Sequence, residues 1–273
     1  MKYTLQSSKY VFKNFIYLFP FAILPAVFFA VSTDKTAITD IVKALLSGNM
    51  SNWTFSRLFN AISILNFSSW KSIVFGLTGV VLIVFCIALM MALLEKHMRI
   101  GKRTYNGLMG KLNDNFTSTL CVVLTVLAIY ELWVLLLSAF LFLLSRITIV
   151  YVAYGLAILA FVAFHILLMT SVGAIYLWLP CMQITGFRAF EALLYSYQLM
   201  SEVKWKIMLA QIGVLIVVEA LVCACAVFLG GQLLFRIVVA LLYAGVMMIY
   251  CVRMQIAYFD RDNIERADIR KYY

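Results

Sequence analysis

The stretch from Ser72 to Leu94, SIVFGLTGVVLIVFCIALMMALL, decides the fold class of this chain. It carries no charge and, as an α-helix, is long enough to cross a hydrocarbon core of about 30 Å. Similar runs recur, so that 65% of the 273 residues are hydrophobic, 12% are charged, and the mean hydropathy is +1.00. Soluble domains are about 45–50% apolar and about 25% charged. The composition excludes a water-soluble bundle and predicts an all-α integral membrane protein.

Six such runs predict six transmembrane helices in one membrane domain covering residues 1–273. The first run contains Pro20 and Pro25, which each remove a backbone hydrogen bond, so we expect a kinked helix there. Pro180 is expected to end the fourth run. The predicted spans are 12–31, 72–94, 116–144, 147–179, 207–229 and 233–254, with a cytoplasmic tail over 255–273.

The basic residues indicate the orientation of these spans. Of the 22 lysines and arginines, 16 lie in segments on the N-terminal side of the predicted membrane and 6 lie on the other side. Because positive segments remain inside, both termini are predicted to be cytoplasmic. The net charge of +10 is explained by this topology and by anionic lipid headgroups. Nucleic acid is not a predicted partner, because the chain has no module combining basic and aromatic residues.

The segments between the spans are not simple loops. In the outer segment, 32–71, apolar residues recur at helical spacing around Ile38 and again around Leu58. This pattern predicts two amphipathic helices in the headgroup plane, with Trp53 and Trp70 as interfacial anchors. The inner segments, 95–115 and 181–206, are likewise predicted to hold interfacial helices.

The two inner segments also resemble each other. Apolar residues follow Gly101 and Gly186 at the same four offsets, 4, 7, 8 and 11 residues later. One interpretation is a parallel repeat of spans 2–3 and 4–5. The other is that any interfacial helix shows this spacing. Both interpretations require helices on the inner membrane face.

A short motif in the second inner segment resembles a known family. Pro180 is followed by Gly186, then by Glu191-Ala192-Leu193, a serine, a leucine, and an aromatic residue at the next span. About 28 residues resemble the YciC-like bacterial membrane proteins and the membrane domain attached to some glycerophosphodiester phosphodiesterases. The chain lacks the acidic residue usual soon after the proline. The resemblance implies a six-span fold in a bacterial cytoplasmic membrane, and it implies no activity.

Three ionisable side chains lie well inside the predicted spans: Glu131, His165 and Glu219. Counted from the inner ends at about 1.5 Å per residue, they fall at similar depth near the middle of the membrane. Such groups usually face the bundle and find partners. They are candidates for an intramembrane polar cluster, either as a proton or cation relay or as hydrogen bonds that hold helices together.

A second candidate site is the basic cluster formed by Lys96, Arg99, Lys102 and Arg103. It could bind anionic lipid headgroups, or it could serve only as an orientation signal. The sequence contains no metal-ligand cluster, nucleophile elbow, phosphate-binding loop or dinucleotide fingerprint. No catalytic, cofactor-binding or metal-binding residue is therefore predicted, and no cofactor.

These features favour a non-enzymatic protein, an accessory, scaffold or envelope-related component of the membrane. Its expected partners are membrane lipids, other membrane proteins or further copies of itself. The alternative is a small transporter or permease subunit with a proton- or cation-linked path along Glu131, His165 and Glu219. A membrane enzyme acting on lipid is the third interpretation.

Overall fold

The computed structural model describes residues 2–48 and 53–269, and within these ranges the protein contains helices and no strands. Six helical stretches are long and apolar enough to cross a membrane, which confirms the predicted fold class and number of spans. These stretches are α2, α5, α6, α7 together with α8, α10 and α11. The helices are α1 (Lys2–Lys13), α2 (Phe15–Ser32), α3 (Lys35–Ser47), α4 (Phe55–Ile62), α5 (Trp70–Ile100), α6 (Leu108–Leu144), α7 (Val150–Ala174), α8 (Trp178–Thr185), α9 (Ala189–Met200), α10 (Lys204–Phe228), α11 (Gln232–Arg261) and the short 3-10 helix η1 (Ala267–Ile269).

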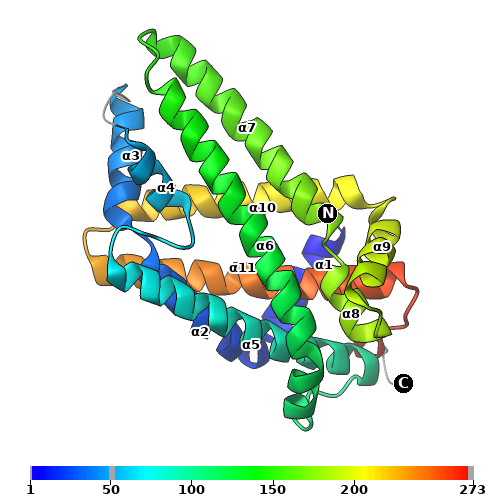
Figure 1. Ribbon diagram of the computed structural model, residues 1–273. Coiled ribbons are helices and arrows are strands. Elements are labelled where there is room, and N and C mark those ends of the chain that lie inside the picture. Colours follow the sequence, from blue (N-terminus) through cyan, green and yellow to red (C-terminus); the bar gives the residue numbers. More distant parts are fainter. Residues whose placement is uncertain (1, 49–52, 270–273) are drawn as a thin grey trace.

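The core of the molecule is the packing of α2 between α5 and α11. The N-terminal helix α1 lies along α11, and η1 packs on α5. Both ends of the described chain lie at the same end of the bundle, together with α8 and α9 (Figure 1). We call this the inner end, because the sequence predicts that the termini are cytoplasmic. The opposite, outer end holds α3, α4 and the turn between α10 and α11.

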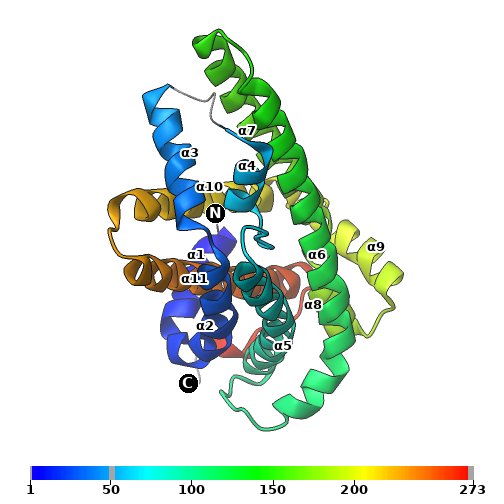
Figure 2. The same cartoon turned by 60° about the vertical axis from the view of Figure 1, so that its left-hand side comes forward.

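Two of the remaining spans, α6 and α7, form a long hairpin. This hairpin crosses the other spans obliquely and extends past α3 and α4 at its tip (Figures 1 and 2). Its helix α6 packs on α5, and α7 packs on α10. Since α6 is 37 residues long, it is much longer than a membrane crossing requires.

The first span, α2, contains both Pro20 and Pro25 within its bounds. The helical conformation is interrupted just before it, at Asn14, which joins α1 to α2. The Asn14 side chain donates from Nδ2 to the Tyr10 carbonyl oxygen at 2.9 Å. This bond to the last turn of α1 competes with regular helix geometry, as asparagine side chains commonly do.

The fourth span is divided in two, so the prediction that Pro180 ends it is wrong. Helix α7 ends at Ala174, and Pro180 lies in the first turn of α8. A proline is tolerated there because the first turn needs no backbone donor.

Gly101 and Gly186, at φ of 75° and 71°, end α5 and α8 in the left-handed conformation.

The inner segments also differ from each other. In the first, the helix that begins at Leu108 is the start of α6 itself, and in the second α9 is a separate helix.

The outer segment forms the two predicted short helices, α3 and α4, and residues 49–52 between them lie outside the described ranges. Helix α3 packs on α10, where Thr39 Oγ1 donates to the Ala226 carbonyl oxygen at 3.0 Å. Helix α4 packs on α6. Trp53, predicted as an interfacial anchor, is buried beside Leu58 and Phe142, whereas Trp70 is exposed.

The last helix extends beyond residue 255, where the sequence predicts that the cytoplasmic tail begins. Helix α11 continues to Arg261, and every residue over 251–259 is buried. The cause is that α1, α2, α5 and α8 all pack on α11. Arg253 is only 1% exposed, and its guanidinium donates to the Tyr176 hydroxyl at 3.1 Å and to the Thr4 hydroxyl at 3.4 Å.

Candidate functional site

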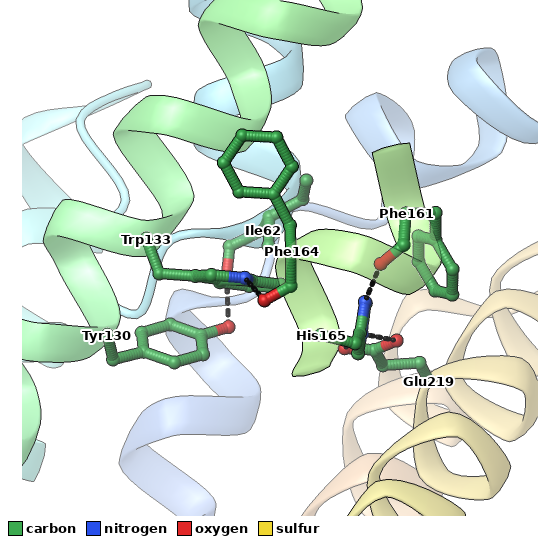
Figure 3. A network of polar contacts seen from close by, with 7 residues as sticks. All are labelled: Ile62, Tyr130, Trp133, Phe161, Phe164, His165 and Glu219. Carbon is green, nitrogen blue, oxygen red and sulfur yellow. Dashed lines mark hydrogen bonds and ion pairs between the residues drawn. The ribbon is translucent and has the colours of Figure 1, made fainter. Parts of the chain in front are cut away.

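Two of the three predicted intramembrane groups form a pair. His165 on α7 faces Glu219 on α10, and its Nε2 lies 3.1 Å and 3.3 Å from the two carboxylate oxygens (Figure 3). The other ring nitrogen, Nδ1, lies 2.7 Å from the Phe161 carbonyl oxygen. Because a carbonyl only accepts hydrogen bonds, Nδ1 carries a proton. The contact between His165 Nε2 and the Glu219 carboxylate then requires one further proton, either on Nε2 or on the carboxylate.

Aromatic side chains of α6 and α7 enclose the histidine of this pair. The Trp133 ring meets the His165 ring edge-on at 5.1 Å, and the Phe161 ring lies 3.9 Å from it. Trp133 Nε1 also donates to the Phe164 carbonyl oxygen at 2.6 Å, which links α6 to α7 (Figure 3). His165 is 1% exposed, whereas the Glu219 side chain is 30% exposed. The pair therefore has a buried base and a partly accessible acid.

The third predicted member, Glu131, has other partners. Its carboxylate accepts hydrogen bonds from the Ser63 hydroxyl at 2.7 Å and from the backbone amides of Ile64 and Leu65 at 3.1 and 3.2 Å. These residues belong to the outer turn, which we define as residues 63–66, between α4 and α5. Bonds from backbone amides to a carboxylate are among the stronger hydrogen bonds in proteins. Glu131 thus attaches the outer turn to α6.

The contacts of the outer turn correct the predicted depth of Glu131. Asn66 Nδ2 donates to the Ser32 carbonyl oxygen at 2.8 Å, and Ser32 Oγ donates to the Ser72 carbonyl oxygen at 3.0 Å. Ser32 is the last residue of α2, and Ser72 lies in the first turn of α5. Glu131 therefore lies level with the outer ends of these helices and not at mid-depth. Counting along α6 failed because α6 is oblique and extends past those ends.

Tyr130, the neighbour of Glu131 on α6, is a further polar side chain of this region. Its hydroxyl donates to the Ile62 carbonyl oxygen at 2.8 Å, at the end of α4 (Figure 3). It is close enough to interact electrostatically with both Glu131 and Glu219. Four helices, α4, α6, α7 and α10, thus contribute to one polar region below the outer turn. Such a region can stabilise helix contacts or transfer protons.

The structure also shows a pocket at the inner end that the sequence did not reveal. It has a volume of about 410 Å³ and lies where the α1–α2 junction meets the C-terminal end of α5 and η1. Its polar lining consists of two cations, a histidine, a tyrosine, an asparagine and an aspartate: Lys13, Arg103, His97, Tyr10, Asn14 and Asp268.

Hydrogen bonds and ring contacts fix the walls of this inner pocket. The Tyr10 hydroxyl bonds to His97 Nδ1, and burial raises the pKa of Tyr10, so that it remains a neutral hydroxyl. The Asp268 carboxylate pairs with Arg266 through bonds of 2.8 and 3.1 Å. With that acid neutralised, Lys13 and Arg103 give the pocket a net positive charge.

The predicted basic cluster is divided in the structure. Arg103 lines the inner pocket and lies 5.5 Å over the Tyr17 ring. Lys96 donates to the Asn106 carbonyl oxygen, and Arg99 pairs with Glu95 at 3.3 Å. Lys102 is exposed. Of the four residues in the predicted cluster, only Arg103 lines the inner pocket. The other cation in the lining, Lys13, belongs to α1, far away in the sequence.

No family model matches the chain, and no curated protein or solved structure matches it. Within the described ranges, no group of three or more histidine, cysteine, aspartate or glutamate side chains is placed to hold a metal ion. Any functional conclusion therefore depends on the two polar sites themselves.

Proposed function

We propose that this protein is a non-enzymatic, multi-pass accessory or scaffold protein of a bacterial cytoplasmic membrane, and that it binds phospholipid headgroups. The observation that carries this proposal is the inner pocket, where Lys13 at the end of α1 and Arg103 in the connection between α5 and α6 both contribute to the lining. The strongly exposed apolar side chains of Phe12 and Ile16 flank Lys13 and Asn14 in the sequence. Cationic groups beside an apolar surface suit a phosphate group attached to acyl chains.

The charge distribution supports this proposal. With both termini cytoplasmic, as the excess of inner basic residues predicts, the inner pocket faces the leaflet whose anionic lipids attract lysine and arginine. The resemblance to YciC-like membrane proteins fits the same location. Further copies of the chain or other membrane proteins remain proposed partners, to be identified by co-purification in mild detergent.

The combined substitution of Lys13→Gln and Arg103→Gln tests the lipid proposal. Each cation near a membrane surface contributes about 1 kcal/mol to binding anionic lipid, so losing both is expected to weaken binding about 25-fold. Displacement of a fluorescent anionic phospholipid from the purified protein measures this loss. Lys111→Gln is the control, because this exposed lysine of α6 is not part of the pocket lining. An equal loss in the control would show diffuse attraction and contradict the proposal.

A second candidate function is proton- or cation-linked transport along the polar region of α6, α7 and α10. The specific observation in its favour is the contact between His165 Nε2 and the Glu219 carboxylate, with Tyr130 and Glu131 nearby. A hydrogen-bonded histidine–carboxylate pair inside a membrane span can pass a proton from one group to the other.

Glu219→Gln separates transport from structural support. The amide keeps a hydrogen-bonding group beside His165 but cannot release a proton, so a relay would stop while the fold remains. Proton flux into proteoliposomes, followed with a pH-sensitive dye, is expected to fall to background if the pair is a relay. Flux equal to that of the unsubstituted protein rules the relay out, and lower stability alone assigns the pair to helix packing.

A further inference from the structure

The N-terminal helix α1 has two faces of different character. One face packs on the bundle, where α1 lies along α11 and the side chains of Tyr10 and Val11 are buried. The other face is open: Leu5 is 62% exposed, Phe12 is 83% exposed, and Lys9 is also exposed. Because these three residues follow one another at intervals of four and three, they lie on the same side of the helix.

This open face carries positive charge and no negative charge. Helix α1 contains three lysines and no acidic residue. Lys2 lies 3.5 Å from the Asp260 carboxylate, but within the described ranges neither Lys9 nor Lys13 forms an ion pair. Lys13 follows Lys9 by four residues on the same side, and it also lines the inner pocket. We define the α1 face as the side chains of Leu5, Lys9, Phe12 and Lys13.

The protein itself holds α1 in its helical form. The Tyr3 hydroxyl donates to the Asp260 carboxylate at 2.5 Å, which joins α1 to α11. The bond between the Tyr10 hydroxyl and His97 Nδ1 joins α1 to α5. The α1 face is therefore presented on a formed helix, and a partner binds it without first having to order a flexible segment.

We propose that the α1 face lies in the headgroup layer of the inner leaflet and binds anionic phospholipids. Lysines beside large apolar side chains are typical of helices that lie in the membrane interface. Only Asn14 separates α1 from the span α2, and Ile16 just beyond it is 81% exposed, so the apolar surface continues into the span. An acidic soluble protein would pair with the lysines but would leave Phe12 in water. The α1 face is a second lipid-binding surface, which does not depend on the inner pocket being occupied.

A tryptophan introduced by Leu5→Trp tests this proposal in the full-length protein. Vesicles contain phosphatidylcholine and phosphatidylglycerol, and one of these two lipids at a time carries bromine atoms, which quench a tryptophan in contact with them. Subtracting the signal of the unsubstituted protein removes its five native tryptophans. Each lysine near a membrane favours anionic lipid about fivefold, so at low salt brominated phosphatidylglycerol is expected to quench the introduced tryptophan at least about twofold more strongly than brominated phosphatidylcholine.

Leu159→Trp is the matched control. Leu159 on α7 is 67% exposed, and residues 147–187 contain no lysine or arginine. The two brominated lipids should quench a tryptophan there equally. Equal quenching at Leu5 as well would overturn the binding of anionic lipid. A tryptophan at Leu5 that neither lipid quenches, but that a water-soluble quencher reaches, would show that the α1 face lies in water and would overturn the membrane as its partner.

A charge reversal assigns the preference to the α1 face. Lys9→Glu, added to Leu5→Trp, is expected to abolish the preference for phosphatidylglycerol, because it removes one cation and repels the anionic headgroup. Lys111→Glu makes the same charge change on α6 and should leave the preference intact. An equal loss with both variants would contradict the assignment to α1. Lys9 does not line the inner pocket, so Lys9→Glu should leave displacement of the fluorescent phospholipid unchanged. A failure of that displacement assay alone would overturn the pocket and not the α1 face.

Discussion

Replacing Glu131 by leucine is expected to lower the free energy of unfolding by about 2–4 kcal/mol and to release the outer turn. The substitution removes the acceptor for Ser63 and for the backbone amides of Ile64 and Leu65. Hydrogen bonds to a carboxylate each contribute about 1.5–3 kcal/mol, and unpaired buried amides add a penalty. Leucine preserves the helix propensity of α6, so the loss comes from the outer turn.

Two measurements check this expectation. Thermal unfolding in detergent can be followed with a thiol-reactive dye, because Cys86, Cys181 and Cys251 are free and buried in the folded protein. Hydrogen exchange of a peptide covering residues 63–66 reports the outer turn directly. Glu131→Gln is the control, since its amide oxygen still accepts from the backbone, and it should lose less than half as much stability. Unchanged exchange in the leucine variant would contradict the role assigned to Glu131.

The substitution Gly79→Val is expected to destabilise the contact between α2 and α5 by about 2–3 kcal/mol. A Cβ atom at Gly79 would lie 2.8 and 2.9 Å from two carbons of the Phe29 ring, which is too close, and 3.2 Å from a third. Phe29 is partly buried between α2 and α5, so its ring must move away from α5 to make room, and overpacking of this kind costs about 1–3 kcal/mol.

Gly213→Val is the matched control for this second prediction. It lies in α10, and a Cβ atom there meets no neighbour within 4 Å. The same dye assay should show little change. Adding Phe29→Ala to Gly79→Val should recover part of the lost stability, as expected for two residues in direct contact. If the double variant is as unstable as the sum of the two single variants, the steric explanation is wrong.

The fold class could be predicted because membrane insertion depends on local composition. An apolar run such as 72–94 must form a helix in hydrocarbon, since no other local structure satisfies its backbone hydrogen bonds. This requirement holds for each run separately, so all six were found. The boundaries were less accurate. Residues 255–259 read as a juxtamembrane tail, but α1 and α8 cover them, and nothing local to that segment reveals those neighbours.

The prolines illustrate the same limit. Pro180 lies in the first turn of a new helix, where its missing donor costs nothing, and the sequence does not show that α7 has already ended at Ala174. For the candidate sites, the expectation that ionisable side chains inside a span find polar partners holds for Glu131, His165 and Glu219. It could not assign the partners, because the tilt of α6 places Glu131 beside the outer turn.

The sequence by itself determined that this chain is helical, has six spans able to cross a membrane, and carries costly polar groups within them. These are consequences of how each segment interacts with hydrocarbon and water. Only the tertiary structure decided that His165 pairs with Glu219, that Glu131 holds the outer turn, and that Lys13, Asn14 and Arg103 line one pocket. Those sites join residues from separate helices, and the packing angles that bring them together depend on side-chain fit along whole helix surfaces.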